Sequence, residues 1–563
     1  MALILTRGGY AQPGTSLNFK TGTWRVQKPY HHHLSAPCHA ICPAGEDAQA
    51  YIAKVDEGHF QQAWETLVAV NPLPAVTGRV CHHPCESACN RGQFDEPIAI
   101  HKIERLLGDQ AIEQGWAYPV EKPRKSALRV AVVGAGPAGL SAAYHLVRRG
   151  YNVTLFDQLP EPGGILRTAL PAYRLPRLVL DAEVGRLLAV GIDFRPHHRL
   201  GRDVSLDELK ADYSAVFLGP GDQQSREWSI DGVVQRDLHV GLDLLKEWVA
   251  MGSVPQCKSV AIVGGGNTAI DLSRILKRAG VNEVHVVTHQ ALPGPDVPRE
   301  EAMSAIRREI DQALEEGVVI HTHRGIRRLI LRGEKVVGME LVHMKKMDKG
   351  GKMQTIAFEG TETVLHVDQV IPAVGQEVDP FGMETLLHQK NSFEVDHWGR
   401  IAGHVGIFVG GDARRGSSGT VSGAIGDGRR AAEAIDAFLR EDKAPVENEP
   451  PTLPFERLNL NYYEHAPRQH EVVLPVDKRL GCEEIEGGLS LGQVSLEARR
   501  CFSCGNCFAC DNCWTLCPDQ AVLKTKELAS DGSHYVFDYD YCKGCGLCAN
   551  ECPCGFIAVE EEV

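Results

Sequence analysis

The sequence predicts an α/β protein with two Rossmann-like nucleotide-binding domains in its middle, a helical domain before them and a small cysteine-rich domain after them. Three observations lead to this prediction: two glycine-rich fingerprints that each follow an apolar stretch, five cysteines within the first 125 residues, and eleven cysteines from Cys501 onward. At 563 residues the chain is expected to hold several domains, because one hydrophobic core rarely grows beyond about 250–300 residues.

The composition narrows the classes of protein to which the chain can belong. Hydrophobic residues make up 43% and charged residues 23%, as in a soluble globular protein. No apolar run approaches the roughly 18 residues of a membrane span. A net charge of −14 argues against nucleic acid as a partner. Eighteen cysteines without a secretory signal indicate a reducing cytoplasm and metal ligation.

The first expected element is a helical domain that carries five cysteines: Cys38, Cys42, Cys81, Cys85 and Cys89. The spacing C-x3-C-x3-C places the last three on one face if the segment is helical. Cys42 precedes a proline and can supply a fourth thiolate to a cubane iron–sulfur cluster. A structural zinc site fits the same spacing, so the residues alone leave the metal open.

The second element is the stretch "LRVAVVGAGPAGLSAAYHLVRRGYNVTLFD". A buried strand over residues 130–133 runs into a GxGxxG turn and a helix, and a second strand ends at Asp157, which can bind a ribose. The predicted cofactor-binding residues of the turn are Gly134, Gly136, Pro137, Ala138 and Gly139. The first glycine makes the tight turn, the second lets the backbone approach a pyrophosphate, and the third allows close packing of helix and strand. A glycine-rich turn without a nucleotide is the alternative.

The third element, "SVAIVGGGNTAIDLSRILKRAGVNEVHVVTH", repeats this pattern. Its predicted cofactor-binding residues are Gly264, Gly266, Asn267, Thr268 and Ala269, with Thr288 and His289 at the end of the second strand. Two dinucleotide sites on one chain indicate two nucleotides, a flavin and a nicotinamide. The flavin site normally comes first, with the nicotinamide domain inserted into it.

Two later stretches fit a chain that returns to the first domain, "VDQVIPAVGQ" and "GIFVGGDARRGSSGTVSGAIGDGRRAA". An Asp after a strand can bind the ribityl or phosphate region of FAD, and the following helix can direct its N-terminus at the flavin. The segment "EPGGILR" would cover the isoalloxazine from the other side. These stretches add the predicted cofactor-binding residues Gly163, Gly164, Leu166, Arg167, Gly375, Gly411, Asp412, Thr420 and Ala424.

The last element carries the spacing C-x2-C-x2-C-x3-C-P twice, as in a two-cluster ferredoxin, where the fourth cysteine of each run binds the other cluster. One [4Fe–4S] cluster is assigned to Cys507, Cys510, Cys513 and Cys552, and the other to Cys542, Cys545, Cys548 and Cys517. A disulfide framework is disfavoured because no secretory signal opens the chain. A zinc site is disfavoured because zinc sites pair C-x2-C units tetrahedrally and do not need eight cysteines in this repeat. Cys501 and Cys504 extend the first run backwards, but the prolines favour the register given, which makes them spare.

Together, these motifs resemble the small subunit of glutamate synthase and its relatives, which include the amino-terminal half of dihydropyrimidine dehydrogenase and a subunit of electron-bifurcating transhydrogenases. The resemblance covers residues 20–440. It implies that Cys42, Cys81, Cys85 and Cys89 hold the cluster nearer the flavin.

A second N-terminal cluster would be left with Cys38 and Glu104, because relatives begin with C-x2-C-x4-C-x3-C-P and this chain departs from that pattern. Tyr30 and His33 stand where the first two cysteines are expected. His33 could be a third ligand. The sequence thus predicts three [4Fe–4S] clusters and leaves a fourth open.

The implied architecture is an FAD domain split around an NAD domain. Its parts are an iron–sulfur domain (1–125), the first FAD part (126–255), the NAD domain (256–370), the second FAD part (371–440), a proline-rich linker (441–495) and the ferredoxin domain (496–563).

The predicted function is electron transfer between NADH, FAD, the clusters and a protein partner, in the cytoplasm. With its ferredoxin tail, "TGTWRVQKP" and "APCHAICPAG", the chain most resembles the family member that serves a reverse-acting dissimilatory sulfite reductase. Glutamate synthase, a 2-oxoacid:acceptor oxidoreductase and a non-catalytic assembly role are the alternatives. No catalytic acid or base is expected, because the hydride step needs none. A homodimer is compatible with the sequence.

NADH is expected over NADPH because the second strand of the NAD fingerprint ends without a permanent cation. NADPH-using relatives carry a pair of arginines there, which bind the 2′-phosphate. This chain has Thr288, His289 and Gln290 instead, and Arg299 in the next loop is the residue that could still reach a phosphate.

Overall fold

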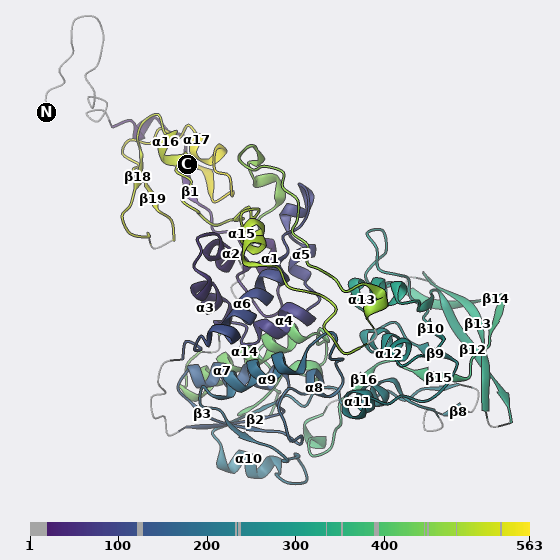
Figure 1. The fold of residues 1–563 in the computed structure, drawn as a ribbon. Helices are drawn as coiled ribbons and strands as arrows, with labels where there is room; N and C mark the ends of the chain where they lie inside the picture. The colour runs from purple at the N-terminus through teal and green to yellow at the C-terminus, as the bar shows by residue number, and fades with distance from the viewer. Residues whose placement is uncertain are drawn as a thin grey trace, which may run out of the picture.

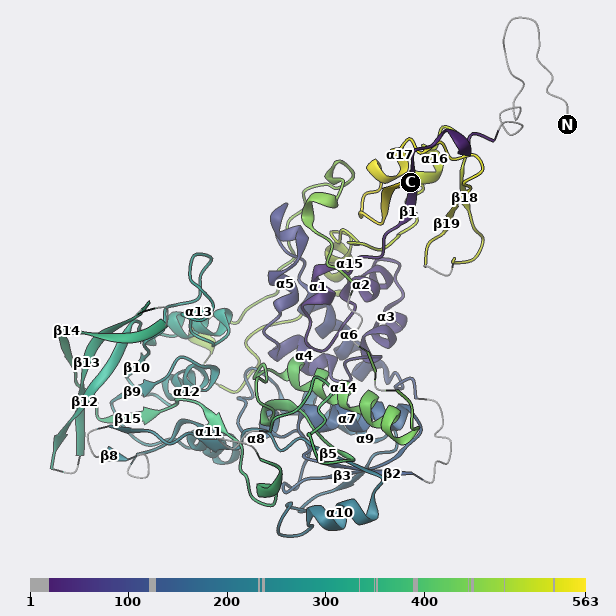
Figure 2. The same ribbon diagram turned by 180° about the vertical axis from the view of Figure 1, so that it is seen from behind.

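The computed structural model describes residues 20–120, 128–230, 233–234, 238–333, 335–348, 350, 353–387, 393–443, 445–446, 450–479, 481–529 and 532–562. Figures 1 and 2 show a purple helical domain between two sheet-containing domains and a small yellow C-terminal part, which confirms the predicted fold class. Within these residues no helix has both the length and the apolar character needed to cross a bilayer.

The N-terminal domain is built from short helices around one longer helix. The helices are α1 (Pro37–Ala40), α2 (Ala48–Asp56), α3 (Phe60–Val68), α4 (Pro74–Val80), α5 (Pro84–Ser87) and α6 (Ile100–Gln114). Two glycines let α4 and α6 cross at backbone contact. A Cβ on Gly78 would lie 2.5 Å from the nitrogen of Arg105, and a Cβ on Gly108 would lie 2.3 Å from that of Ala75.

The first Rossmann-like domain contains a five-stranded parallel sheet in the order β17-β5-β2-β3-β4. Its strands are β2 (Arg129–Val133), β3 (Asn152–Phe156), β4 (Asp193–Arg195), β5 (Ala215–Leu218) and β17 (Ile407–Val409). Its helices are α7 (Pro137–Arg148), α8 (Ile165–Thr168), α9 (Arg177–Leu188), α10 (Leu206–Asp212) and α14 (Val421–Leu439). Because β17 pairs with β5 across almost 190 residues of chain, the sheet is closed by the returning segment, as an inserted second domain requires.

The inserted domain has a four-stranded parallel sheet in the order β11-β10-β9-β15. Its strands are β9 (Ser259–Val263), β10 (Glu283–Val287), β11 (Val319–His321) and β15 (Gln369–Pro372), and its helices are α11 (Gly241–Met251), α12 (Asn267–Arg278) and α13 (Arg307–Glu315). Helix α11 lies before the expected boundary at residue 256, yet its leucines belong to the same buried core as α12.

The inserted domain also carries a long antiparallel sheet that the sequence did not predict. It consists of β12 (Arg324–Arg332), β13 (Lys335–Asp348) and β14 (Met353–Leu365). Four short strands complete this half of the molecule: β6 (Gln224–Ser225), β7 (Ser229–Ile230), β8 (Val233–Val234) and β16 (Gln376–Glu377). Pairing of β6 with β16 joins the outgoing and the returning crossings between the two domains.

The segment expected as a linker is extended but bound along the surface of the other domains, as its course in Figure 1 shows. Glu484 pairs with Arg79 at 2.8 Å, Glu486 with Lys102 at 3.0 Å, and Arg468 with Glu86 at 2.6 Å. The N–H of Ile485 donates to the oxygen of Tyr173 at 3.2 Å. These contacts fix the path from the second nucleotide domain back to the helical domain.

The C-terminal part contains α15 (Leu491–Ala498), α16 (Asn512–Thr515), β18 (Val522–Lys524), β19 (Tyr535–Phe537), α17 (Leu547–Asn550) and β20 (Ile557–Glu561). An unexpected partner joins it: β1 (Gln27–His31) pairs antiparallel with β20, so that His31 lies opposite Ile557. The start and the end of the described chain therefore fold as one unit, seen beside α16 and α17 in Figure 2.

Candidate functional site

The first fingerprint forms a sharp turn between β2 and α7. Gly134 has φ +97°, and a Cβ there would lie 2.2 Å from the oxygen of Gly219. A Cβ on Gly139 would lie 1.8 Å from the oxygen of Gly134. Gly136 differs, because its Cβ would meet no atom closer than the Cα of Gly164 at 4.0 Å. The space in front of Gly136 is free for a pyrophosphate at the N-terminus of α7.

A cavity of about 120 Å³ opens at this turn. Its lining includes the predicted residues Gly134, Gly136, Pro137, Ala138, Asp157, Gly164, Gly411, Asp412 and Ala424. Asp157, at the end of β3, accepts hydrogen bonds from the N–H groups of Ala135 at 2.6 Å and Leu159 at 2.8 Å. A carboxylate offers about four lone-pair sites, so Asp157 retains capacity for a ribose hydroxyl.

A larger cavity of about 820 Å³ adjoins the first and contacts the second fingerprint. The two cavities share Ile165, Asp222 and Asp412 in their walls. Predicted residues that line the larger one are Leu166, Gly264, Gly266, Asn267, Thr268, Thr288, His289, Gly375, Asp412 and Thr420. The two predicted nucleotide sites are therefore neighbouring cavities with common wall residues, and the volume of the larger one is that of a cofactor site.

The second fingerprint repeats the geometry of the first. Gly264 has φ +145°, and its Cβ would lie 2.2 Å from the oxygen of Ala373. The position of Gly266 is open, since the nearest atom to a Cβ there would be the Oγ of Ser304 at 3.6 Å. Ala269 does not reach the cavity; it is fully buried in the core between α12 and the sheet. It takes the packing role of the third glycine.

The segment before α8 contributes less to the cavities than expected. Gly164 packs against Gly136, because a Cβ on it would lie 2.9 Å from the Cα of Gly136. Gly163 is not in either wall, and Arg167 is directed into ion pairs with Glu161 at 2.9 Å and Asp181 at 2.5 Å. Arg167 is therefore already paired with two carboxylates, and its contact with the cofactor stays a prediction.

The N-terminus of α14 faces the larger cavity. Thr420 caps this helix by accepting a hydrogen bond from the N–H of Gly423 at 3.1 Å, and Thr420 and Val421 lie in the cavity wall. The positive end of a helix dipole favours negative charge in front of it. Asp412, which lies before the helix, accepts a hydrogen bond from the Oγ of Ser417 at 3.0 Å.

The end of β10 carries no permanent cation. Thr288 is buried and its hydroxyl accepts a hydrogen bond from the N–H of Gln290 at 3.2 Å. Burial lowers the pKa of His289, and the charge of Lys346 lowers it further, so His289 is neutral at pH 7. Sequence reasoning missed Arg324, which begins β12 and lines the same cavity.

Two further polar side chains in the cavity wall were not predicted. His82 lies 3.2 Å from the side-chain nitrogen of Asn267, and burial lowers the pKa of His82 to about 4. Burial and the nearby carboxylate of Asp412 raise the pKa of Asp222 to about 7. His82 could have been found in the sequence, because it directly follows the predicted ligand Cys81. Asp222 could not, because it follows a strand end that carries no known motif.

Cys42, Cys81 and Cys85 form the group of thiols nearest the large cavity. Val80 and His82, the neighbours of Cys81, are in the cavity wall. Burial and the charges of Glu46 and Cys81 raise the pKa of Cys42, and burial with Glu86, Cys42 and Cys81 raises that of Cys85. The Sγ of Cys81 lies 3.5 Å from the Oγ of Ser422 on α14.

A buried carboxyl pair completes this group and corrects one expected assignment. Glu104 accepts hydrogen bonds from Thr77 and from the amide nitrogen of Asn71, the latter at 3.0 Å. Burial and, after it, the charge of Glu104 raise the pKa of Cys81. Asn71 also donates to Glu46 at 2.7 Å, and burial raises the pKa of Glu46 to about 7. Glu104 was expected beside Cys38, but it lies beside Cys81 because α6 packs across α4.

Cys89 also lies elsewhere than expected. It was grouped with Cys42, Cys81 and Cys85, but it lines a separate cavity together with Cys38, Cys501 and Cys504. The two cysteines set aside as spare are therefore at a second group of thiols. His33 is not in that cavity; its side chain is exposed and packs edge-on against Phe556.

The remaining cysteines lie in the sets that the doubled motif predicts. Cys507, Cys510, Cys513 and Cys552 line one cavity. Burial and the thiols of Cys542, Cys517 and Cys545 raise the pKa of Cys548 to about 12, which places those four together. Cys554 was not predicted at either set; its Sγ lies 3.8 Å from that of Cys552. The ligand assignments themselves remain predictions.

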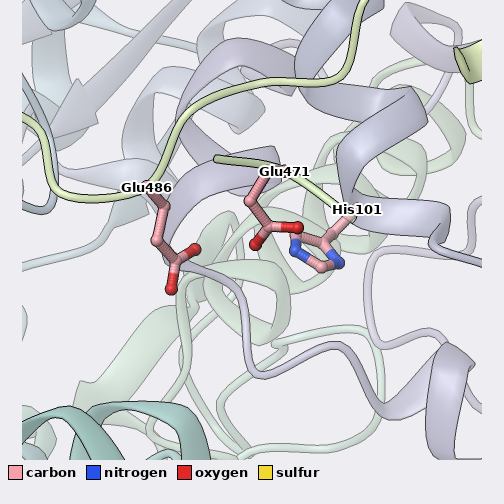
Figure 3. Close-up of side chains that lie close together, drawn as sticks. All are labelled: His101, Glu471 and Glu486. Carbon is pink, nitrogen blue, oxygen red and sulfur yellow. The ribbon is translucent and has the colours of Figure 1, made fainter. Parts of the chain in front are cut away.

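His101, Glu471 and Glu486 form a further cluster of metal-type ligands, with ligand atoms within 4.8 Å of one another (Figure 3). Positively charged side chains of the protein already pair with these carboxylates. The Nζ of Lys102 lies 2.7 Å from Glu471 and 3.0 Å from Glu486, and Arg308 pairs with Glu486 at 2.8 Å. The cluster is an ion-pair network that binds the extended segment to α6.

Three family models match the chain. Residues 128–428 match the pyridine nucleotide-disulphide oxidoreductase model, residues 32–116 match the 4Fe-4S domain II of dihydropyrimidine dehydrogenase, and residues 506–556 match a 4Fe-4S dicluster domain. The first match spans both fingerprints and the returning segment. The other two fall on the two cysteine-bearing ends.

Three curated proteins are each 33% identical to this chain. The NADP(+)-dependent formate dehydrogenase subunit beta of Moorella thermoacetica matches over 84% of this chain and 71% of that protein. The NADPH-Fe(3+) oxidoreductase subunit beta of Geobacter sulfurreducens matches over 85% and 77%. The glutamate synthase [NADPH] small chain of Escherichia coli matches over 71% of this chain and 88% of that protein.

Proposed function

Because this chain belongs to the glutamate synthase small-subunit-like branch of the pyridine nucleotide-disulphide oxidoreductases, we propose that it transfers electrons between a reduced nicotinamide nucleotide and a protein partner through its clusters. It is an FAD- and NAD(P)-dependent oxidoreductase with iron–sulfur domains at both ends. The observation that carries the proposal is the pair of adjoining cavities, one at each fingerprint, of which the larger, about 820 Å³, has the neighbours of Cys81 in its wall.

The residues around these two cavities would position the two nucleotides. Bound FAD would accept electrons in pairs from nicotinamide and release them singly to clusters. The turn at Gly134 and Gly136 would hold its pyrophosphate at α7, and the N-terminus of α14 would face its ring. Productive transfer requires the reacting atoms about 3–3.5 Å apart, so these residues act by orientation, and no side chain acts as acid or base.

We propose NADH as the nucleotide. Thr288 and Gln290 can bond a ribose hydroxyl, while the neutral His289 offers no charge to a 2′-phosphate. Two observations favour NADPH instead. Arg324 lines the cavity, and the three relatives described above carry NADP(H) in their names.

We propose that the electrons leave through the ferredoxin part. Cys545 of the last predicted cluster and Cys510 of the other are exposed, and Trp514 and Phe508, close to Cys510 in sequence, are 47% and 43% exposed. Exposed aromatic side chains are typical of protein interfaces. The proposed partner is a reverse-acting dissimilatory sulfite reductase, on the resemblance of the tail and the N-terminal stretches; glutamate synthase and a 2-oxoacid:acceptor oxidoreductase are the alternatives. The proposed location is the cytoplasm, whose reducing thiol pool keeps cysteines available to clusters.

Anaerobic rapid mixing tests the proposed activity. NADH added to the isolated protein should reduce the flavin first and the clusters afterwards, each seen as a loss of its own absorbance. A protein whose flavin is not reduced by NADH or NADPH would be a non-catalytic assembly subunit. For the partner, steady NADH oxidation should depend on added dissimilatory sulfite reductase and not on equal amounts of the two alternative partners; dependence on one of those would overturn this assignment.

A further inference from the structure

Four cysteines from the two ends of the chain line one buried cavity: Cys38, Cys89, Cys501 and Cys504. The rest of its wall is mainly apolar and includes Ile52 and Ile98. Cys501 and Cys504 precede residues 506–556, which match the dicluster domain, and lie outside the N-terminal match as well. Neither family match therefore accounts for the meeting of these four thiols.

The cavity resembles the one at the first ferredoxin-type set of cysteines. Both have a volume of about 20 Å³ and are lined by cysteines together with apolar side chains; Cys554 is an additional thiol in the wall of the ferredoxin-type cavity. The cavity at Cys507, Cys510, Cys513 and Cys552 carries the spacing of a cubane-binding site. The equal volumes indicate that the cavity at Cys38, Cys89, Cys501 and Cys504 fits a group of the same size as the cluster predicted at the ferredoxin-type cavity.

The geometry disfavours zinc and disulfides. A zinc ion with Zn–S bonds of about 2.3 Å brings its four sulfurs to about 3.8 Å from one another. Among the described residues, no three of these sulfurs lie within 4.8 Å of each other. All four cysteines are free thiols. A cubane, whose irons separate its ligands, fits this wider arrangement.

Buried polar contacts hold the tail segment against the helical domain. The carboxylate of Glu497 accepts a hydrogen bond from the N–H of Ala99 at 2.8 Å. Arg500 pairs with Asp95 at 3.0 Å, and its carbonyl oxygen accepts a hydrogen bond from Arg91 at 2.9 Å. Glu497 is fully buried and Arg500 is 3% exposed. These buried contacts, made directly before Cys501, fix where the tail segment meets the helical domain.

Hydrogen-bond donors are already directed at the sulfurs. The N–H of Ser503 lies 3.5 Å from the Sγ of Cys501, and the amide nitrogen of Asn90 lies 3.6 Å from the Sγ of Cys504. Such bonds stabilise the negative charge of cluster thiolates and tune the reduction potential. The buried cation Arg91 lies beside Cys501.

We propose that Cys38, Cys89, Cys501 and Cys504 bind a [4Fe–4S] cluster whose ligands come in pairs from the two ends of the chain. The cluster joins the helical domain to the ferredoxin part covalently through iron. Wild-type protein isolated without air then holds four clusters, about sixteen irons per chain.

Its position makes this cluster a relay, a role that rests on the proposed function. Cys504 and Cys507 are three residues apart, so their Cα atoms are at most about 11 Å apart. On the side of the helical domain, Cys89 of this cluster is one helical turn in sequence from Cys85, which belongs to the group of thiols at Cys42 and Cys81. Electrons would pass from the group at Cys81 to this cluster and then to the ferredoxin clusters.

Removing the tail ligands tests the site. The Cys501→Ser/Cys504→Ser variant should lose about four irons and four acid-labile sulfides per chain. It should also lose one cluster signal in EPR of the reduced protein, while FAD content and NADH-driven dye reduction stay within about two-fold of wild type. The matched control is Cys257→Ser/Cys482→Ser, which removes two thiols outside every group and should keep all the iron.

A second variant keeps the test decisive if the first misfolds. Cys38→Ser, at the other end of the chain, should lose the same EPR signal. Unchanged iron in the double variant, loss of zinc in place of iron, or loss of different signals in the two variants would overturn the site. Loss of iron in a protein whose flavin does not respond to NADH would leave the site standing and sink the proposed function.

Discussion

The Sγ of Cys81 lies 3.5 Å from the Oγ of Ser422, although 341 positions separate them. This contact joins the helical domain to the first turn of α14, whose N-terminus opens on the large cavity. It links a helix that opens on the large cavity to a predicted cluster ligand, and it gives the first prediction.

Ser422→Ala should lower the reduction potential of the cluster at Cys81. A thiolate at Cys81 would accept a hydrogen bond from Ser422, and such bonds stabilise the reduced, more negative cluster. A net bond of about 1 kcal/mol corresponds to a shift on the order of 40 mV for a one-electron couple. An EPR-monitored redox titration measures it. Ser273→Ala is the control, because this buried hydroxyl donates to its own helix, α12, at 2.7 Å. Equal potentials in wild type and Ser422→Ala would remove Cys81 from the ligand set.

Gly136→Val should abolish FAD binding and all activity, since the side chain would occupy the space left for the pyrophosphate. The measurement is FAD per chain after anaerobic isolation, together with dye reduction. Gly185→Val on α9 is the control, because a Cβ there would meet nothing within 4 Å. A Gly136→Val protein with full flavin content would place the nucleotide elsewhere.

The wild-type enzyme should have a higher kcat/KM for NADH than for NADPH. The Thr288→Arg/His289→Arg variant should shift the preference towards NADPH by about tenfold or more, because guanidinium groups pair with the 2′-phosphate. Arg324→Gln should leave kcat/KM for NADH within about threefold of wild type. A wild type that prefers NADPH, and loses this preference in Arg324→Gln, would show that Arg324 is the phosphate ligand.

Loss of the last cluster should separate the two activities of the protein. Cys545→Ser/Cys548→Ser should leave NADH-driven dye reduction near wild type and abolish transfer to the partner protein. Deletion of the chain from residue 496 is a poorer test, because it would also remove Glu497 and Arg500, which are buried against the helical domain. A double variant that still serves its partner at full rate would show that electrons leave by another route.

The Glu183→Gln variant should gain stability relative to wild type as the pH rises. Glu183 accepts hydrogen bonds from the N–H groups of Ala75 and Val76 at 2.8 and 2.9 Å, which ties α4 to α9. Burial raises the pKa of Glu183 from 4.5 to about 8. Ionisation between these values is penalised only in the folded state, so Glu183 lowers the free energy of unfolding of wild type progressively from pH 4.5 to 8. Glutamine does not ionise.

Apparent urea midpoints of wild type and Glu183→Gln, measured without air at pH 5 and pH 7.5, check this prediction. The urea midpoint of Glu183→Gln minus that of wild type should be larger at pH 7.5 than at pH 5. A difference that is independent of pH would mean that Glu183 stays ionised throughout, held by its two backbone donors.

The sequence by itself determined the motifs that lie within one turn or one short run of chain. The close packing at the third position of the first fingerprint is predictable because it depends on a contact a few residues away, that of Gly139 against Gly134. The two ferredoxin sets are predictable for the same reason: the C-x2-C-x2-C spacing directs three sulfurs to one place. The insertion of one nucleotide domain into the other also followed from the order of these motifs.

Only the tertiary structure decided which thiols meet across the molecule. The sequence grouped Cys89 with Cys85 on spacing, yet Cys89 lies with Cys38, Cys501 and Cys504. Local spacing constrains the direction of a side chain but not the partner that a distant segment brings to it. That partner depends on the packing of α15 against the helical domain through Glu497 and Arg500, and on the pairing of β1 with β20. The free energy of those long-range contacts is set by shape and burial, which no short stretch of this sequence records.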